Sequence, residues 1–275
     1  MQGTKNAYNV RMMHARRSIA DTQGFSLVEL SIVLVILGLL TGGILGGQSL
    51  IRAAELRSVS TSYASYATAM QTFRDKYFAL PGDMNNATKF WNSAGGTGAD
   101  STCYTAQVAG NPATCNGNGD GQIFTSAFIY SERFATWKHL ANAGLVEGSY
   151  SGVTAGAAGT YTEVLGTNVP RAKLSNGFFD ITYEPTNALL YAPGTRAEVN
   201  VIALYGTASS RGILKPEEAW NIDTKMDDGS PVYGKVFANK KTSATSPNCA
   251  SSDADNATYD FSLTATNCSL KLAAN

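Results

Sequence analysis

Hydrophobic residues in the first third of the chain follow two successive patterns. From Phe25 to Leu45 nearly every position is apolar, and Glu29 is the one charged residue. At about 1.5 Å per helical residue this run measures roughly 30 Å, the thickness of a bilayer core. Apolar positions then recur every three or four residues from Val59 to Leu80, with polar residues between them. The two patterns predict one long helix with an apolar first half and an amphipathic second half.

The end of this helix is predicted at Pro81–Gly82, because proline disfavours a helical residue before it and glycine allows a turn. Asp83 suits the N-cap of a short helix that extends through Trp91. From about residue 95 to 121 the chain is rich in Gly, Asn, Ser and Thr, which predicts a loop.

The remainder of the chain predicts both helices and antiparallel strands. Ser131 to Ala143 has the period of a helix capped by Gly144. Pro216 suits the first turn of another helix, which ends near Met226. Apolar or alternating segments bounded by turn residues predict strands at 178–183, 188–192, 199–205 and 232–238. The expected fold is α+β, with the long N-terminal helix packed on an antiparallel sheet that carries long loops.

Composition and charge limit the classes of function. The chain has 21 basic and 21 acidic residues, and charged residues make up 15%. A nucleic-acid-binding surface needs clustered Lys and Arg, so nucleic acid is not an expected partner. Basic residues do precede the apolar run, and they predict that the N-terminus stays inside and the rest of the chain lies outside. They are Lys5, Arg11, Arg16 and Arg17.

Glu29 separates several explanations of the apolar run. An ordinary signal peptide has a shorter apolar core followed by a small-x-small cleavage site. A plain single-span anchor explains the length of the run but not Glu29. A charged group in a membrane helix costs about 2.5–3.5 kcal/mol at the helix centre and less near the interface. Glu29 is therefore a functional candidate that needs a partner.

The string from Gly24 to Leu40, G-F-S-L-V-E-L-S-I-V-L-V-I-L-G-L-L, resembles the processing and methylation site of type IV prepilins and type II secretion pseudopilins. The resemblance implies that prepilin peptidase cuts after Gly24 and N-methylates Phe25. It also implies that Glu29 pairs with the N-terminal amine of a neighbouring subunit. One such charge pair per subunit sets the register of a filament. The string KYFALPGDM is similar to the helix exit of a subset of pilin-like proteins.

The resemblance implies an organisation in four parts. These are a leader over 1–24, a membrane and polymerisation helix over 25–47, an amphipathic helix over 48–80 and a periplasmic α+β domain over 81–275. The implied partners are prepilin peptidase, other pilin or pseudopilin subunits, an inner-membrane assembly platform and membrane lipid. The chain would cross the inner membrane once and then enter a pilus or pseudopilus. The alternative is a membrane-anchored periplasmic binding module or hydrolase that forms no filament.

Glycines occupy the part of the apolar run where many major pilins carry a helix-kinking proline. They are Gly42, Gly43, Gly46 and Gly47. Each weakens a helix by about 1 kcal/mol, so the helix can bend or melt there when the subunit leaves the membrane. Small residues also allow helices to pack closely, and the pattern does not separate the two interpretations.

Four cysteines follow the apolar run, which places them outside the cytoplasm in an oxidising compartment. Three connectivities are possible, and the simplest pairs Cys103 with Cys115 and Cys249 with Cys268. Each disulfide would contribute about 3 kcal/mol in the chain-entropy model. A zinc site is disfavoured, because neither pair has CxxC spacing or a histidine nearby. The second pair resembles the C-terminal disulfide loop of pilins.

Two oxygen-rich segments are candidates for calcium, which takes six to eight oxygen ligands. Asn116, Asn118 and Asp120 alternate with glycines as in the first half of a calcium loop, but Ala127 replaces the glutamate expected at position twelve. Glu132 is a candidate to complete that set. A second acidic cluster lies further along the chain: Asp223, Asp227 and Asp228. Turn chemistry and helix termination are the alternatives, and no other cofactor is expected.

Catalysis is not expected. The histidines are His14, which leaves with the leader, and His139, which is expected on the surface of a helix. No GxSxG, P-loop or dinucleotide-binding pattern occurs. No pair of acidic residues is marked out for glycan hydrolysis.

Overall fold

The computed structural model describes residues 24, 26–99, 101–123, 132–155, 162–184, 199–207, 211–238, 249–251 and 256–274. It divides into two compact units, Met1–Leu50 and Ile51–Asn275. The helices are α1 (Leu27–Tyr77), α2 (Thr88–Trp91), α3 (Ser101–Ala106), α4 (Glu132–Asn142) and α5 (Pro216–Met226). The strands are β1 (Gly177–Glu184), β2 (Val199–Gly206), β3 (Val236–Ala238) and β4 (Leu270–Ala273).

The first unit contains the beginning of helix α1. The helix continues without a break through the glycines between positions 42 and 47. Its apolar side chains are exposed, as Leu27 (89%) and Leu39 (73%) illustrate. Helix α1 is long and apolar enough to cross a membrane.

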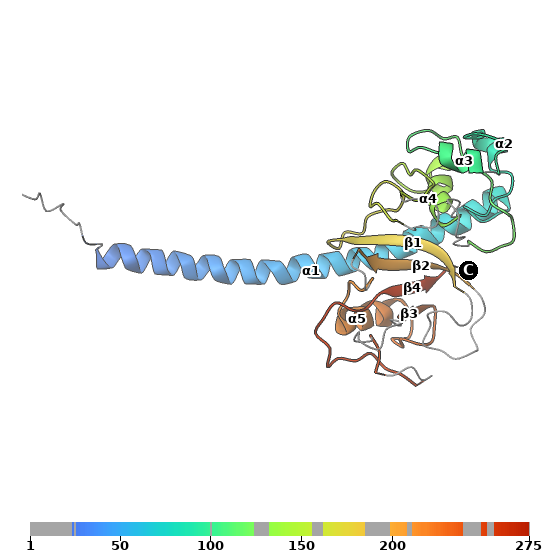
Figure 1. Ribbon diagram of the computed structural model, residues 1–275. Coiled ribbons are helices and arrows are strands. Elements are labelled where there is room, and N and C mark those ends of the chain that lie inside the picture. The colour runs from blue at the N-terminus through green and yellow to red at the C-terminus, as the bar shows by residue number, and fades with distance from the viewer. Residues whose placement is uncertain are drawn as a thin grey trace, which may run out of the picture. The chain divides into compact units, whose positions relative to one another are not determined.

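The second unit is built on a four-stranded sheet in the order β1-β2-β4-β3, with every neighbouring pair antiparallel (Figure 1). In the register of β1 and β2, Phe179 lies opposite Leu204 and Ile181 opposite Ile202. These apolar residues are buried, as expected for one face of a sheet that packs against a helix.

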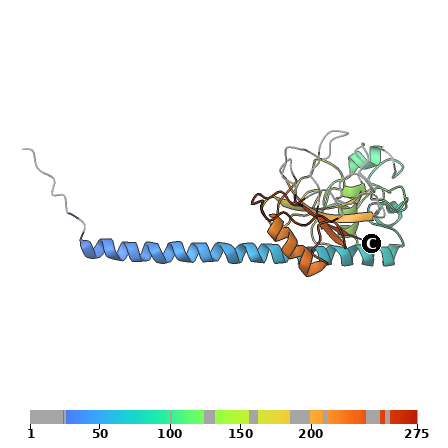
Figure 2. The same cartoon turned by 90° about the horizontal axis from the view of Figure 1, so that it is seen from below.

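The second half of α1 supplies that helix (Figure 2). Val59, Tyr63, Met70 and Phe73 of the predicted apolar stripe are buried, and the other members of the stripe are half-buried. The Tyr63 ring meets the Phe179 ring edge-on at 5.4 Å, and the Tyr63 hydroxyl donates to the carbonyl of Leu270 at 2.6 Å. The expected α+β fold, a long helix on an antiparallel sheet, is thus confirmed.

Helix α1 ends at Tyr77, three residues before the predicted Leu80. Phe78 has a φ of 54°, and its N–H donates to the carbonyl of Arg74 at 2.8 Å. Glycine normally occupies this position, because the left-handed conformation costs other residues about 1–2 kcal/mol. The Phe78 side chain is 92% exposed. A strained backbone at Phe78 therefore stops the helix before the proline does.

Several other predictions need correction. The short helix after Pro81 is reduced to α2, whose N-cap is Ala87 without a side-chain hydrogen bond. Helix α3 lies inside the segment expected to be a loop, and its residue Cys103 forms a disulfide with Cys115 of the same segment. Strand β3 is shorter than predicted, and β4 was not predicted because only four residues carry its pattern. The strand expected at 188–192 lies outside the described residues.

The bounds of helices α4 and α5 agree closely with the predictions from periodicity. Gly144 has a φ of 72° after α4, and Pro216 is in the first turn of α5. Periodicity succeeds here because each helix carries an apolar stripe and a local stop or start signal.

Candidate functional site

The candidate processing segment is at the start of α1. Gly24 and Ser26 are exposed and lie just before the helix, and Phe25 lies outside the described residues. Glu29 is in the first turn, where its Oε2 accepts the N–H of Ser26 at 2.9 Å. The Ser26 hydroxyl accepts the N–H of Val28 at 3.3 Å. Ser26 and Glu29 have the S-x-x-E spacing of a capping box, and Glu29 makes the return bond to the N–H of Ser26, so that Glu29 caps the first turn of α1.

The carboxylate of Glu29 thus lies where the helix dipole favours an anion. It remains exposed, so the cap does not prevent it from meeting a cation of another molecule. The capped conformation is therefore compatible with the subunit pairing that the resemblance implies for Glu29.

A three-way polar contact fixes α1 where it enters the second unit. Arg52 forms two hydrogen bonds with the carboxylate of Glu218 on α5, both at 2.7 Å, and a third with Glu55 at 3.1 Å. Glu218 also accepts the N–H of Lys215 at 2.9 Å and so caps α5. One carboxylate therefore joins the first turn of α5 to α1.

The Asn/Gly segment of the first calcium prediction encloses the carboxylate of Asp83. The Oδ1 atom of Asp83 accepts the N–H groups of Gly119 (2.6 Å) and Asp120 (3.0 Å), and its Oδ2 accepts that of Gly121 (2.9 Å). Burial raises the pKa of Asp83, although the three N–H donors oppose the rise. Asp83 was predicted to cap a helix; instead it holds a loop more than thirty residues away in sequence.

The side-chain oxygens of this segment are already used within the protein. The Oδ1 atom of Asn116 accepts the N–H of Thr88 at 2.9 Å, and that of Asn118 accepts the N–H of Asp120 at 3.0 Å. Carboxylate oxygens of Asp83, Asp120 and Glu132 do lie within 4.8 Å of one another. The segment thus forms turns around the Asp83 carboxylate, Glu132 approaches it by accepting the N–H of Asn118, and calcium binding here stays a prediction.

The second acidic cluster is also assembled. Carboxylate oxygens of Asp223, Asp227 and Asp228 lie within 4.8 Å of one another. Asp223 is fully buried and accepts hydrogen bonds from Tyr259 (2.7 Å) and Gly229 (3.2 Å). Burial first, and then the two neighbouring carboxylates, raise the pKa of Asp223 to about 7 against these donors. Calcium binding at this cluster stays a prediction.

His139 was expected on the surface, and this expectation is wrong. The side chain is fully buried: its Nδ1 accepts the N–H of Gly82 at 2.9 Å, and its Nε2 lies 3.0 Å from the Thr114 hydroxyl. The imidazole stacks near the rings of Phe73 and Trp91. Burial lowers the pKa of His139 to about 4, so the ring is neutral near pH 7. Loops from distant parts of the chain cover the face of α4 that its polar residues predicted to be exposed.

Two disulfides close the loops of the second unit. Cys103 joins Cys115 and Cys249 joins Cys268, which is the local connectivity. The first lies with Tyr104 in a small separate cluster of buried residues. The second belongs to the main core, beside the bridge between Leu214 and Cys268.

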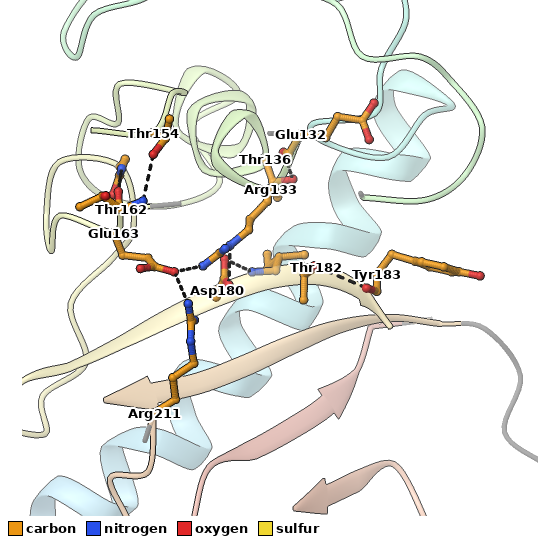
Figure 3. A network of polar contacts seen from close by, with 12 residues as sticks. Glu132, Arg133, Thr136, Thr154, Thr162, Glu163, Asp180, Thr182, Tyr183 and Arg211 are labelled. Atoms are coloured by element: carbon orange, nitrogen blue, oxygen red, sulfur yellow. Dashed lines mark hydrogen bonds and ion pairs between the residues drawn. The ribbon is translucent and has the colours of Figure 1, made fainter. Parts of the chain in front are cut away.

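A buried ionic network, which no sequence pattern indicated, joins α4 to β1 (Figure 3). The Nε atom of Arg133 lies 2.6 Å from a carboxylate oxygen of Asp180, and its Nη2 contacts Glu163. Arg211 also pairs with Glu163, at 2.9 Å. Burial acts to raise the pKa of Glu163, but the two guanidinium groups outweigh it and hold that pKa below its usual value. Burial raises the pKa of Asp180 despite Arg133.

Comparison with known proteins identifies the N-terminal segment. Residues 20–45 match the family model described as the prokaryotic N-terminal methylation motif. The chain therefore carries the signature of type IV prepilins and pseudopilins. This signature indicates a structural, pilin-like precursor, and the long apolar helix suits a membrane-anchored, single-pass protein. No curated protein and no solved structure matches the chain.

Proposed function

We propose that this chain is a structural subunit of a type IV pilus or a type II secretion pseudopilus. Prepilin peptidase cuts it after Gly24 and methylates the new N-terminus at Phe25. An inner-membrane assembly platform then transfers the subunit from the lipid into a filament with other pilins or pseudopilins. The globular part occupies the periplasmic side before assembly.

The observation that carries this proposal is the methylation motif at the start of a helix whose first half exposes its apolar side chains. Burying apolar surface stabilises by about 25 cal/mol per Å², so such a helix requires either lipid or other helices around it. Lipid covers the helix before assembly, and neighbouring subunits cover it afterwards. Cleavage would also create a cationic amine at Phe25, which a Glu29 carboxylate of the next subunit can neutralise.

The organisation of the chain supports a different role for each of its segments. Residues 25–47 serve as the membrane and polymerisation helix, 48–80 carry the helix into the globular domain, and 81–275 form that domain. The contact between Arg52 and Glu218 fixes the helix at this junction.

Mass spectrometry of the mature protein tests the processing step. We expect an N-terminus at Phe25 carrying one N-methyl group. An intact leader, or cleavage at another position in a host that has the peptidase, would exclude the proposal.

Two substitutions at Glu29 separate its charge from its capping role. Glu29→Gln keeps the capping box, which accepts either residue, but removes the charge. Glu29→Ala removes both. We expect both variants to lose incorporation into filaments, measured by the fraction of subunits recovered in sheared filaments. Normal incorporation of both variants would favour the alternative, a membrane-anchored binding module or hydrolase.

A further inference from the structure

Phe78 combines two features that oppose folding stability. Its backbone lies in the left-handed region, with a φ of 54°. Its side chain is 92% exposed, the highest value among the large hydrophobic residues that the structure describes. Glycine would end the helix at this position without strain, and a polar residue would avoid the exposed ring. The exposed ring on a strained backbone makes Phe78 a candidate for a contact made outside the folded chain.

The same unit contains a hollow suited to an aromatic ring. A groove of about 860 Å³ runs between α1 and α5, where Figure 2 shows the two helices side by side. Its apolar lining includes Leu56 of α1 and Ile222 and Met226 of α5. Arg57 and Lys225 border it, and neither side chain forms an ion pair with a described residue.

These properties favour an aromatic occupant over an aliphatic one. An apolar floor stabilises any hydrophobic side chain, but cations at the edge are attracted specifically to the face of an aromatic ring. A phenyl group can thus contact the floor and the two cations together. We define this hollow as the α1–α5 groove.

Phe78 cannot reach the groove of its own chain. Ala64, the groove residue of α1 nearest to it in sequence, lies fourteen residues before Phe78 on the helix that ends at Tyr77, which corresponds to about 20 Å. The helix is continuous from Ala64 to Tyr77, the residue before Phe78, so the separation is fixed. A ring in the groove must therefore come from another molecule.

We infer that Phe78 of one copy inserts into the α1–α5 groove of a second copy. Phe78 and the α1–α5 groove are different surfaces of the same chain, so the contact between two copies is head-to-tail. A head-to-tail contact that does not close into a ring repeats as an open polymer. The inference rests on the proposed filament function and adds a contact between globular domains to the helix contacts.

Cysteine cross-linking tests the contact directly. Phe78→Cys is placed in one tagged copy of the full-length chain and Met226→Cys in a differently tagged copy, both in cells that process and assemble it. We expect a disulfide-linked dimer that contains both tags, at least fivefold above the yield from either variant alone. The matched control is Phe90→Cys with Met226→Cys, because Phe90 is also an exposed aromatic residue (54%) of the same unit. An equal yield in the control would overturn the inference.

Phe78→Gly provides a second test, in which we expect thermal stability to rise and incorporation into filaments to fall. The substitution removes the backbone strain and the exposed ring, so the melting temperature should rise by about 2–4 °C. Incorporation into filaments should nevertheless fall severalfold, because the ring that enters the α1–α5 groove is lost. A variant that is stabilised and incorporated normally would overturn the inference.

The outcomes distinguish this inference from the proposed function. Absence of N-methyl-Phe25 refutes the function itself. Normal methylation and assembly without the Phe78–Met226 cross-link refutes the inference alone. A cross-link from Met226→Cys to Leu39→Cys, in place of Phe78→Cys, assigns the groove to the apolar half of a neighbouring α1 and also refutes it.

Discussion

At the scale of single residues, burial shifts the pKa values of His139 and Asp223 well away from their ordinary values. His139 has a lowered pKa of about 4, because burial disfavours its cationic form. Asp223 has a raised pKa of about 7, because burial and two adjacent carboxylates disfavour its anionic form. The two groups affect folding stability in opposite directions as the pH changes.

The contribution of His139 should be lost in acid. The unfolded chain protonates this histidine below about pH 6.5, whereas the folded protein resists protonation until about pH 4. Stability due to His139 is therefore complete above pH 6.5 and falls as the pH drops towards 4. In His139→Asn the amide oxygen can still accept the N–H of Gly82, but the group no longer titrates. Melting temperatures from pH 4 to 7 should fall less steeply for the variant, and parallel profiles would contradict the assignment.

The contribution of Asp223 should be lost as the pH rises. The folded protein keeps the proton that the unfolded chain releases above about pH 4, so stability falls until the pH passes about 7. Asp223→Asn preserves the shape and cannot ionise. We expect its melting temperature to exceed that of the wild type at pH 8 and to lose this advantage at pH 5. The same gain at both pH values would show that ionisation of Asp223 is not the cause.

Calcium binding can be tested with the same variant, Asp223→Asn. If the cluster of Asp223, Asp227 and Asp228 binds the ion as the sequence predicts, added Ca²⁺ should raise the wild-type melting temperature at pH 8. The increase should be smaller for Asp223→Asn. Equal responses of the two proteins would count against a site at this cluster.

At the scale of secondary-structure elements, polar contacts decide how helices meet the sheet. Periodicity identified the buried stripe of α1 because its residues recur at helical spacing. It misjudged α4, where the residues from Glu132 to Leu140 are buried on every side. The polar members of α4 are covered because they pair with distant groups, as Arg133 pairs with Asp180 and Lys138 donates to the carbonyl of Val108.

Loss of one partner of the Arg133–Asp180 pair should destabilise the second unit strongly. Arg133→Met leaves the carboxylate of Asp180, a buried residue of β1, without its cation, a change that typically costs about 3–5 kcal/mol. The double variant Arg133→Met with Asp180→Leu removes both charges and should recover much of this loss. Denaturant unfolding measures the free energies of all the variants. A double variant as unstable as the sum of the single changes would contradict a coupled pair.

At the scale of the whole molecule, the two disulfides should differ in how much each contributes to the global free energy of unfolding. Cys249–Cys268 lies in the main core and directly precedes β4, an inner strand of the sheet. Cys103–Cys115 belongs to a separate small cluster of buried residues.

Replacement of each disulfide by two serines tests this difference. Loss of Cys249–Cys268 should lower the global free energy of unfolding by about 3 kcal/mol, the usual value for a loop of this length. Loss of Cys103–Cys115 should increase hydrogen exchange in 93–121 with a smaller global effect. Equal global losses would show that the small cluster unfolds together with the core.

The sequence alone was sufficient for the methylation segment, the long two-part helix with its buried stripe, and α5. These features depend on residues close together in the chain: a continuous apolar run, a repeat of three or four positions and a proline start signal. The α+β class followed from the same local signals. Phe78 marks their limit, since no pattern indicated a left-handed aromatic residue at the helix end.

Only the tertiary structure decided which polar groups are buried and what they contact. Asp83 holds a loop around residue 120, His139 supports the turn at Gly82, and Arg133 pairs with Asp180. The partners in each case are separated by tens of residues, and each polar group is stable in the interior only because its partner arrives there. The local sequence around each residue does not indicate these contacts, because the fold as a whole brings the distant partners together.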